Sequence, residues 1–137
     1  MRTFNLPLTF VSFIVALCGL QTPAFASEVG WRELAEHPER FIGQTVELGP
    51  VYCGNNGDKP GYMCSTAGSL FVNPKMLATG LSKNKIDKNC GGLDWIEKSA
   101  FCRVKLRFIP TGFHTSTELE KPRTVIVIES DVATPSF

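Results

Sequence analysis

The chain has 137 residues, with 14 Lys and Arg against 13 Asp and Glu, 43% hydrophobic residues and five cysteines. A formal net charge of +1 disfavours general nucleic-acid binding, because proteins that bind a phosphate backbone usually carry a basic excess. The length fits one domain behind a targeting segment.

Residues 1–26 have the pattern of a signal peptide. Arg2 supplies the positive start, a mostly apolar stretch follows, and Ala24-Phe25-Ala26 offers small residues where a signal peptidase reads. We therefore expect cleavage before Ser27 and a periplasmic or secreted domain, 27–137. The apolar stretch is too short to span a bilayer comfortably, so the mature chain should have no transmembrane segment. Without Arg2 the basic and acidic residues balance at 13 each.

Residues 27–38 predict a short helix. Trp31, Leu34 and Ala35 stand at i, i+3 and i+4, the spacing of one helical face. Pro38 is expected to end the helix, and Trp31 to cover the core.

Three strands are expected next. The β-forming residues of 44–53 predict the first strand, with a bend or bulge at Gly49-Pro50. A turn-rich stretch, 54–61, separates it from a second strand at 62–65. Leu70-Phe71-Val72 gives the third strand.

A helix is expected between the third and fourth strands. Asn73-Pro74 predicts its start, because Asn caps helices and Pro suits their first turn, and Gly80 predicts its end. Residues 81–93 predict a polar loop, and 94–98 a further turn of helix. The loop carries three lysines, Lys83, Lys85 and Lys88. They are either solvated or bind an anionic partner.

The fourth strand, 101–110, has the clearest pattern in the chain. Apolar and basic residues alternate along it, which predicts one buried and one exposed face. The apolar set is Cys102, Val104, Leu106 and Phe108, and the basic set is Arg103, Lys105 and Arg107. Pro110 is expected to end this strand, because proline cannot continue a ladder of hydrogen bonds.

The fifth strand, 124–129, is a continuous run of mostly β-branched residues, which predicts burial on both sides. The preceding stretch, 111–123, is expected to be a polar loop. The tail, 133–137, is expected to fray.

Four cysteines remain after cleavage, and an even number in an exported chain indicates disulfides. They are Cys53, Cys64, Cys90 and Cys102. Three pairings are possible, and we favour Cys53–Cys64 with Cys90–Cys102 because each closes a short loop. Zinc is the rival interpretation, but structural zinc sites usually contain close pairs such as C-x-x-C.

Five strands with a helix between the third and fourth match the outline of an OB-fold, a five-stranded Greek-key barrel. The stretch HPERFIGQTVEL at 37–48 resembles the opening of exported bacterial OB-like domains. In those domains a short helix and an aromatic-aliphatic-Gly step lead into the first strand. We therefore expect a mainly β domain with short helices, built as an OB-fold-like barrel with an N-terminal helix. A small α+β fold or an open β-sandwich is the alternative.

The sequence offers no recognisable catalytic motif. Neither His37 nor His114 has an acid and a nucleophile at a known motif spacing. Signatures of phosphate loops and metallohydrolases are missing. We expect a non-enzymatic protein without cofactor or metal. A small periplasmic enzyme or inhibitor domain that acts through its loops is the alternative.

The expected function is binding of a partner on the barrel face. OB-folds bind on strands two and three and the adjoining loops. The predicted binding residues are Tyr52, Tyr62, Phe71, Arg103, Lys105 and Arg107. They suit a protein or envelope component, such as an anionic glycan, a lipid head group or an acidic protein patch. Alternatively, the aromatics belong to the core and the cations only keep a strand face solvated.

Overall fold

The computed structural model describes residues 26–55, 60–66, 70–91, 100–117 and 123–137. The expected signal segment, apart from Ala26, and the expected helical turn at 94–98 lie outside the described residues. No helix in the described ranges is both long enough and apolar enough to cross a membrane.

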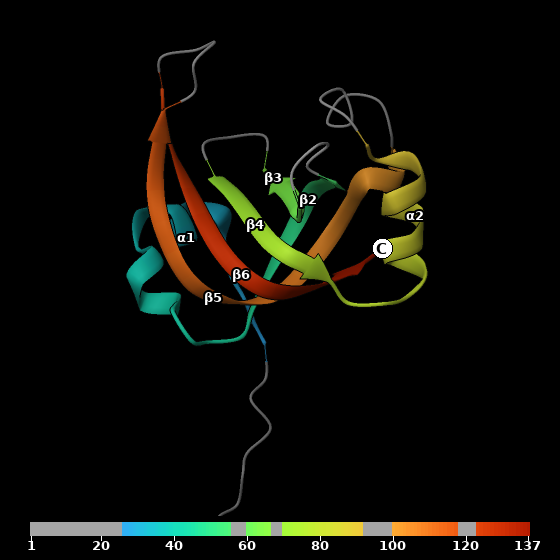
Figure 1. Ribbon diagram of the computed structural model, residues 1–137. Helices are drawn as coiled ribbons and strands as arrows, with labels where there is room; N and C mark the ends of the chain where they lie inside the picture. The colour runs from blue at the N-terminus through green and yellow to red at the C-terminus, as the bar shows by residue number, and fades with distance from the viewer. Residues whose placement is uncertain (1–25, 56–59, 67–69, 92–99, 118–122) are drawn as a thin grey trace, which may run out of the picture.

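The elements follow one another as strands with short helices between them (Figure 1). In chain order they are β1 (Ser27–Glu28), α1 (Trp31–Glu36), the 3-10 helix η1 (Pro38–Phe41), β2 (Val46–Asn55), β3 (Tyr62–Ser65), β4 (Leu70–Leu77), α2 (Leu81–Asn89), the 3-10 helix η2 (Ala100–Cys102), β5 (Arg103–Thr117) and β6 (Thr124–Ser136). The prediction of a mainly β fold with short helices is confirmed.

The strands form one six-stranded mixed sheet in the order β1-β2-β3-β4-β6-β5, and β2 also pairs with β5. The pairings therefore return to β2 after passing through β3, β4, β6 and β5. Within this ring only β4 and β6 run parallel. Figure 1 shows the strands curving round a common interior, with α1 and α2 on opposite sides.

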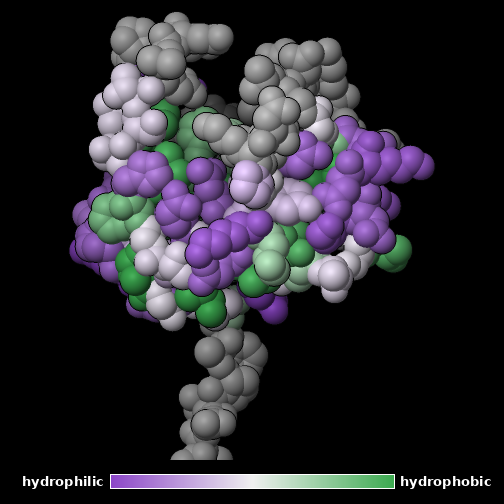
Figure 2. Space-filling model, viewed as in Figure 1, coloured by the Kyte–Doolittle hydropathy of each residue, from purple (hydrophilic) through white to green (hydrophobic). Residues whose placement is uncertain are grey.

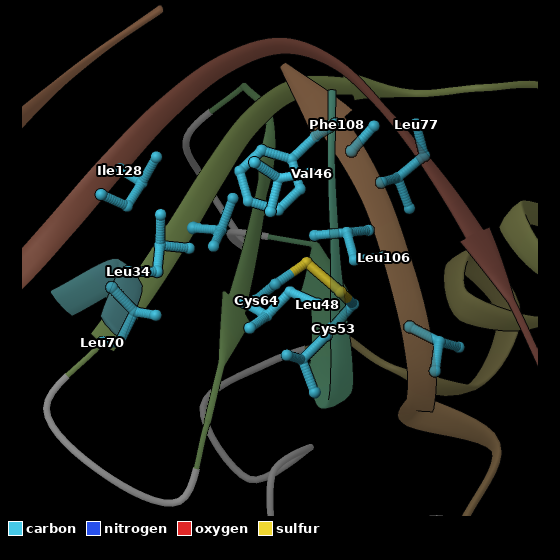
Figure 3. Packing of buried hydrophobic residues seen from close by; sticks show 14 of the residues in the cluster. Leu34, Val46, Leu48, Cys53, Cys64, Leu70, Leu77, Leu106, Phe108 and Ile128 are labelled. Carbon is cyan, nitrogen blue, oxygen red and sulfur yellow. A yellow bond between two sulfur atoms is a disulfide. The ribbon is translucent and has the colours of Figure 1, made fainter. Parts of the chain in front are cut away.

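The core lies on the concave side of the sheet. Leu106 of β5 stands directly opposite Leu48 of β2 and Pro135 of β6, and all three side chains are buried. Leu34 of α1 and Ile86 of α2 add two fully buried side chains. Leu34 and Leu70 belong to the same buried cluster (Figure 3), so α1 supplies apolar surface to the core of the sheet.

Both disulfides have the predicted partners. Cys53 and Cys64 stand opposite each other in the β2–β3 ladder, with their Cα atoms 4.0 Å apart. Cys90, which directly follows α2, is bonded to Cys102, the last residue of η2 and the one before β5, with a Cα separation of 5.8 Å. All four cysteines are fully buried. One bond therefore links two strands, and the other holds α2 to the sheet.

The interruption predicted in the first long strand is confirmed. The β2–β5 register shifts between Leu48 and Val51. A Cβ atom at Gly49 would lie 2.9 Å from the Lys105 Cγ and 3.0 Å from its Cα, so glycine is needed for this close approach.

The N-terminal helix is shorter than predicted. Residues 31–36 form α1, whereas Ser27 and Glu28 pair with β2 instead. Leu34 is buried, but Trp31 is 39% exposed, so the expectation that Trp31 covers the core was wrong.

The prediction of a helix beginning at Asn73-Pro74 was wrong. β4 continues to Leu77, and the helix occupies 81–89, where a loop was expected. β3 pairs with β4 only as far as Val72, so the missing N–H of Pro74 breaks no bond to β3. Only Ile86 of α2 is buried, so the sequence of this helix lacks the apolar periodicity from which a helix could be predicted.

The predicted end of the fourth strand was also wrong. Apolar and basic side chains alternate between buried and exposed as expected, but β5 passes Pro110 and runs to Thr117. The β5–β6 register shifts on both sides of Pro110, so the proline sits where the ladder is already irregular.

The last strand is longer than expected. The apolar residues of β6 at 125–128 are all buried or half-buried, which confirms the predicted burial on both sides of this strand. The tail does not fray up to Ser136, because 133–136 pair with β5 and Ala133 and Pro135 are buried.

Candidate functional site

A row of side chains joined by the ladder register crosses five strands of the sheet. Residues directly opposite one another in a ladder share a face. The register therefore aligns Arg103, Tyr52, Ser65, Phe71, Val127 and His114, contributed by β5, β2, β3, β4, β6 and the far end of β5. We call this set the outer row. Arg103 is exposed, Tyr52 and Phe71 are half-buried, and Ser65 and Val127 are buried. Tyr52 also packs against the core cluster.

The outer row brings together three of the six predicted binding residues. Arg103 is the direct partner of Tyr52, and Phe71 lies two strands beyond Tyr52. At about 4.8 Å per strand, Arg103 and Phe71 are roughly 14 Å apart along the sheet. A cation therefore stands at one end of a surface that carries two partly exposed aromatic rings.

The other two predicted cations, Lys105 and Arg107, are already paired with carboxylates. Lys105 Nζ lies 3.6 Å from Glu28 Oε1 and 3.7 Å from Glu47 Oε1, and Arg107 Nη2 lies 3.5 Å from Glu47 Oε2. These exposed pairs add little stability, but they lower the net positive charge of this part of the strand. No described acid lies within ion-pair distance of Arg103, which makes it the stronger candidate of the three.

Tyr62 is separated from the outer row. It stands on the same side of β3 as the buried Cys64, and its hydroxyl donates a 2.7 Å hydrogen bond to Asp87 Oδ1 of α2. The Lys83 ammonium binds the other oxygen of Asp87 and lies 5.9 Å from the centre of the Tyr62 ring. This arrangement attaches α2 to β3.

The pKa values of this cluster shift in opposite directions. Burial opposes ionisation of Asp87, but the hydrogen bonds from Lys83 and Tyr62 outweigh it and lower the pKa of the Asp87 carboxyl. Burial, followed by the hydrogen bond to Asp87, raises the pKa of the Tyr62 hydroxyl. At neutral pH the cluster therefore holds an ionised carboxylate between a neutral phenol and an ammonium.

Acid is expected to weaken this attachment of α2. The pKa of Asp87 is lower in the folded protein than its ordinary value of 3.8. The ionised carboxylate therefore contributes its full stabilisation above pH 3.8 and loses it as the pH falls through the lower, folded-state pKa. Both ion-pair partners are partly exposed, so the effect should stay below about 1 kcal/mol. Unfolding free energies measured from neutral pH to below 3.8 should fall less steeply for Asp87→Asn than for wild type. Identical profiles would contradict this role.

Polar side chains border the outer row where β4, β6 and β5 meet. Glu129 stands opposite Asn73, and its Oε1 lies 3.4 Å from His114 Nδ1. The Asn73 Oδ1 atom is buried and has no hydrogen-bond partner among the described residues. Near η1, His37 Nδ1 lies 3.6 Å from Glu39 Oε1. Each histidine is therefore near a carboxylate, and the enzyme alternative stays a prediction.

Helix α2 presents a second surface, and the Cys90–Cys102 disulfide joins the end of this helix to the residue before Arg103. Leu81, Asn84, Lys85, Lys88 and Asn89 are the described residues that line a hollow of about 350 Å³. The Lys85 ammonium lies 4.7 Å from the centre of the Phe137 ring. Figure 2 shows hydrophilic side chains gathered over this helix, on the right of the view.

Sequence reasoning missed the polar neighbours of the outer row. The sequence predicts Asn73 as a helix cap and His114 in a loop, whereas both belong to strands. The alternation along 125–129 could have placed Glu129 on the face of Val127, but the partner strands could not be read from it. Within the described ranges no group of three or more His, Cys, Asp or Glu side chains could hold a metal ion.

Comparisons with known proteins assign no family. No protein-family model matches the chain, and no curated protein matches it. A solved structure described as an aspartyl-tRNA synthetase from Leishmania major Friedlin aligns with 86% of this chain at 14% identity and a TM-score of 0.39. This chain spans only 22% of that protein's length. The similarity is too low to support any statement about function.

Proposed function

We propose that residues 27–137 form an exported, OB-fold-like Greek-key barrel that acts as a non-enzymatic binding module. The ring of pairings through β2, β3, β4, β6 and β5 supports this fold, as does the position of α2 between β4 and β5. The two buried disulfides support an oxidising compartment such as the periplasm or the cell exterior.

The single observation that carries the proposal is the outer row. OB-folds bind ligands on their second and third strands, which correspond here to β3 and β4, and the row crosses both. Tyr52 and Phe71 offer aromatic surface, and the Arg103 guanidinium offers several N–H donors in one plane. This chemistry suits an anionic group on a protein or envelope component, positioned at Arg103 while its apolar part contacts the rings.

Charge reversal at Arg103 tests the proposal. Binding of the purified protein would be measured with three anionic probes: a uronic-acid oligosaccharide, soluble glycerol phosphate and a polyglutamate peptide. At least one probe should bind the wild type, and Arg103→Glu should weaken that binding about tenfold or more, because it replaces an attraction by a repulsion.

Arg40→Glu is the matched control, since it makes the same charge change on η1, outside the outer row. It should bind as the wild type does. Lack of binding to all three probes would refute the proposal, and so would an equal loss in the two variants. Arg107→Glu is a poorer control because it also breaks the pair with Glu47.

A further inference from the structure

Two of the most exposed apolar side chains among the described residues lie close together beside α2. Leu81 is 81% exposed and Phe137 is 58% exposed. Lys85 connects them, because it follows Leu81 by one helical turn and its ammonium lies over the Phe137 ring at 4.7 Å. Exposed apolar side chains grouped in this way usually mark a surface that meets something less polar than water.

Cations surround these apolar side chains. Lys88 follows Leu81 by seven residues and Lys85 by three, so all three share one helical face. No described acid pairs with Lys85 or Lys88, whereas Lys83, on another face, is bound to Asp87. The face formed by Leu81, Lys85, Lys88 and Phe137, which we call the α2 face, is therefore both apolar and positively charged.

The size of this face decides what kind of partner it fits. At 1.5 Å per residue, the nine-residue helix is about 13 Å long, and with a width of about 10 Å it covers roughly 130 Å². Stable protein–protein interfaces bury about 800 Å² on each partner. A bilayer needs no such area, because single apolar side chains can insert between head groups while lysines remain at the phosphate level.

We propose that the α2 face docks the protein onto an anionic lipid bilayer. Leu81 and Phe137 enter the head-group region, and Lys85 and Lys88 contact lipid phosphates. The Lys85 side chain lies along the Phe137 ring, which lets its charge stay at the surface while the ring inserts. This surface shares no residue with the outer row, although the Cys90–Cys102 disulfide brings the end of α2 next to Arg103.

Vesicle cosedimentation tests the proposal with protein purified from the periplasm or culture medium. The wild type should bind vesicles of phosphatidylglycerol and phosphatidylcholine at least about tenfold more tightly than phosphatidylcholine alone, and added salt should weaken the binding. Lys85→Glu/Lys88→Glu should reduce binding about 30-fold or more. Leu81→Ser/Phe137→Ser should reduce it about tenfold or more, with unchanged melting temperature because both side chains are exposed.

Two controls separate this proposal from the one above. Arg32→Glu/Arg40→Glu makes the same total charge change on α1 and η1 and should bind vesicles far better than the lysine double variant. Arg103→Glu should also bind vesicles far better than the lysine double variant, because Arg103 is not part of the α2 face. Equal binding to neutral and anionic vesicles, or none to either, would overturn the proposal. Polyglutamate binding that is lost in the lysine variant, without vesicle binding, would overturn it in favour of an acidic protein partner.

Discussion

Leu106→Ala is expected to lower the free energy of unfolding by about 3–5 kcal/mol. The Leu106 side chain is fully buried, and the strands on both sides of it are held by ladder hydrogen bonds, opposite Leu48 and Pro135. The surrounding structure can therefore do little to fill the cavity that the substitution leaves. Urea denaturation would measure the loss.

Arg107→Ala is the natural control for this prediction, because Arg107 is the next residue along β5 and faces outward. Removing its exposed pair with Glu47 should cost less than about 1 kcal/mol. A similar loss in both variants, or a loss below about 1 kcal/mol for Leu106→Ala, would mean that β5 does not present alternate faces to core and solvent.

Replacing either cysteine pair by alanine is expected to cost about 3 kcal/mol, since the bonds close loops of nearly equal length, with sequence separations of 11 and 12 residues. Losing both should cost about 6 kcal/mol, which is comparable to the whole stability of a typical small domain. We therefore expect the chain with all four cysteines replaced to be largely unfolded at 37 °C. Circular dichroism during thermal unfolding would measure each variant.

Loss of the two disulfides should affect different parts of the protein. The strands joined by Cys53–Cys64 are also held by ladder pairing, whereas Cys90–Cys102 attaches α2. Hydrogen exchange of the α2 amides should therefore rise much more when Cys90 and Cys102 are replaced. Equal protection of α2 in the two double variants would show that the Tyr62–Asp87 hydrogen bond and the Ile86 packing hold the helix without this disulfide.

Local patterns in the sequence predicted the parts of this fold that depend on neighbouring residues. The alternation from Cys102 to Phe108 gave the correct buried and exposed faces, and the short spacings gave the correct disulfides. Strand ends depended on distant partners. Asn73-Pro74 was expected to begin a helix and Pro110 to end a strand, but Pro74 has no β3 partner to lose and Pro110 lies in an irregular ladder.

The candidate site shows the same division between local and long-range information. Aromatic and basic residue types suggested binding, but only the register could show that Arg103 stands beside Tyr52 and that Tyr62 faces α2 instead. Lys105 and Arg107 appeared equivalent to Arg103 in sequence. Their neighbours distinguish them, because Glu28 of β1 and Glu47 of β2 lie close to Lys105 and Glu47 also lies close to Arg107. Arg103 has no described acid within ion-pair distance.

Strand β6 comes after all the other strands in the chain, yet it pairs along both of its edges, with β4 on one side and β5 on the other. A growing polypeptide therefore cannot close the ring until its last described segment has left the ribosome or the translocation channel. Until then β4 and β5 each have an open edge on which another chain can add a strand. A chaperone that covers those two edges during synthesis would protect the protein for as long as it is vulnerable to aggregation.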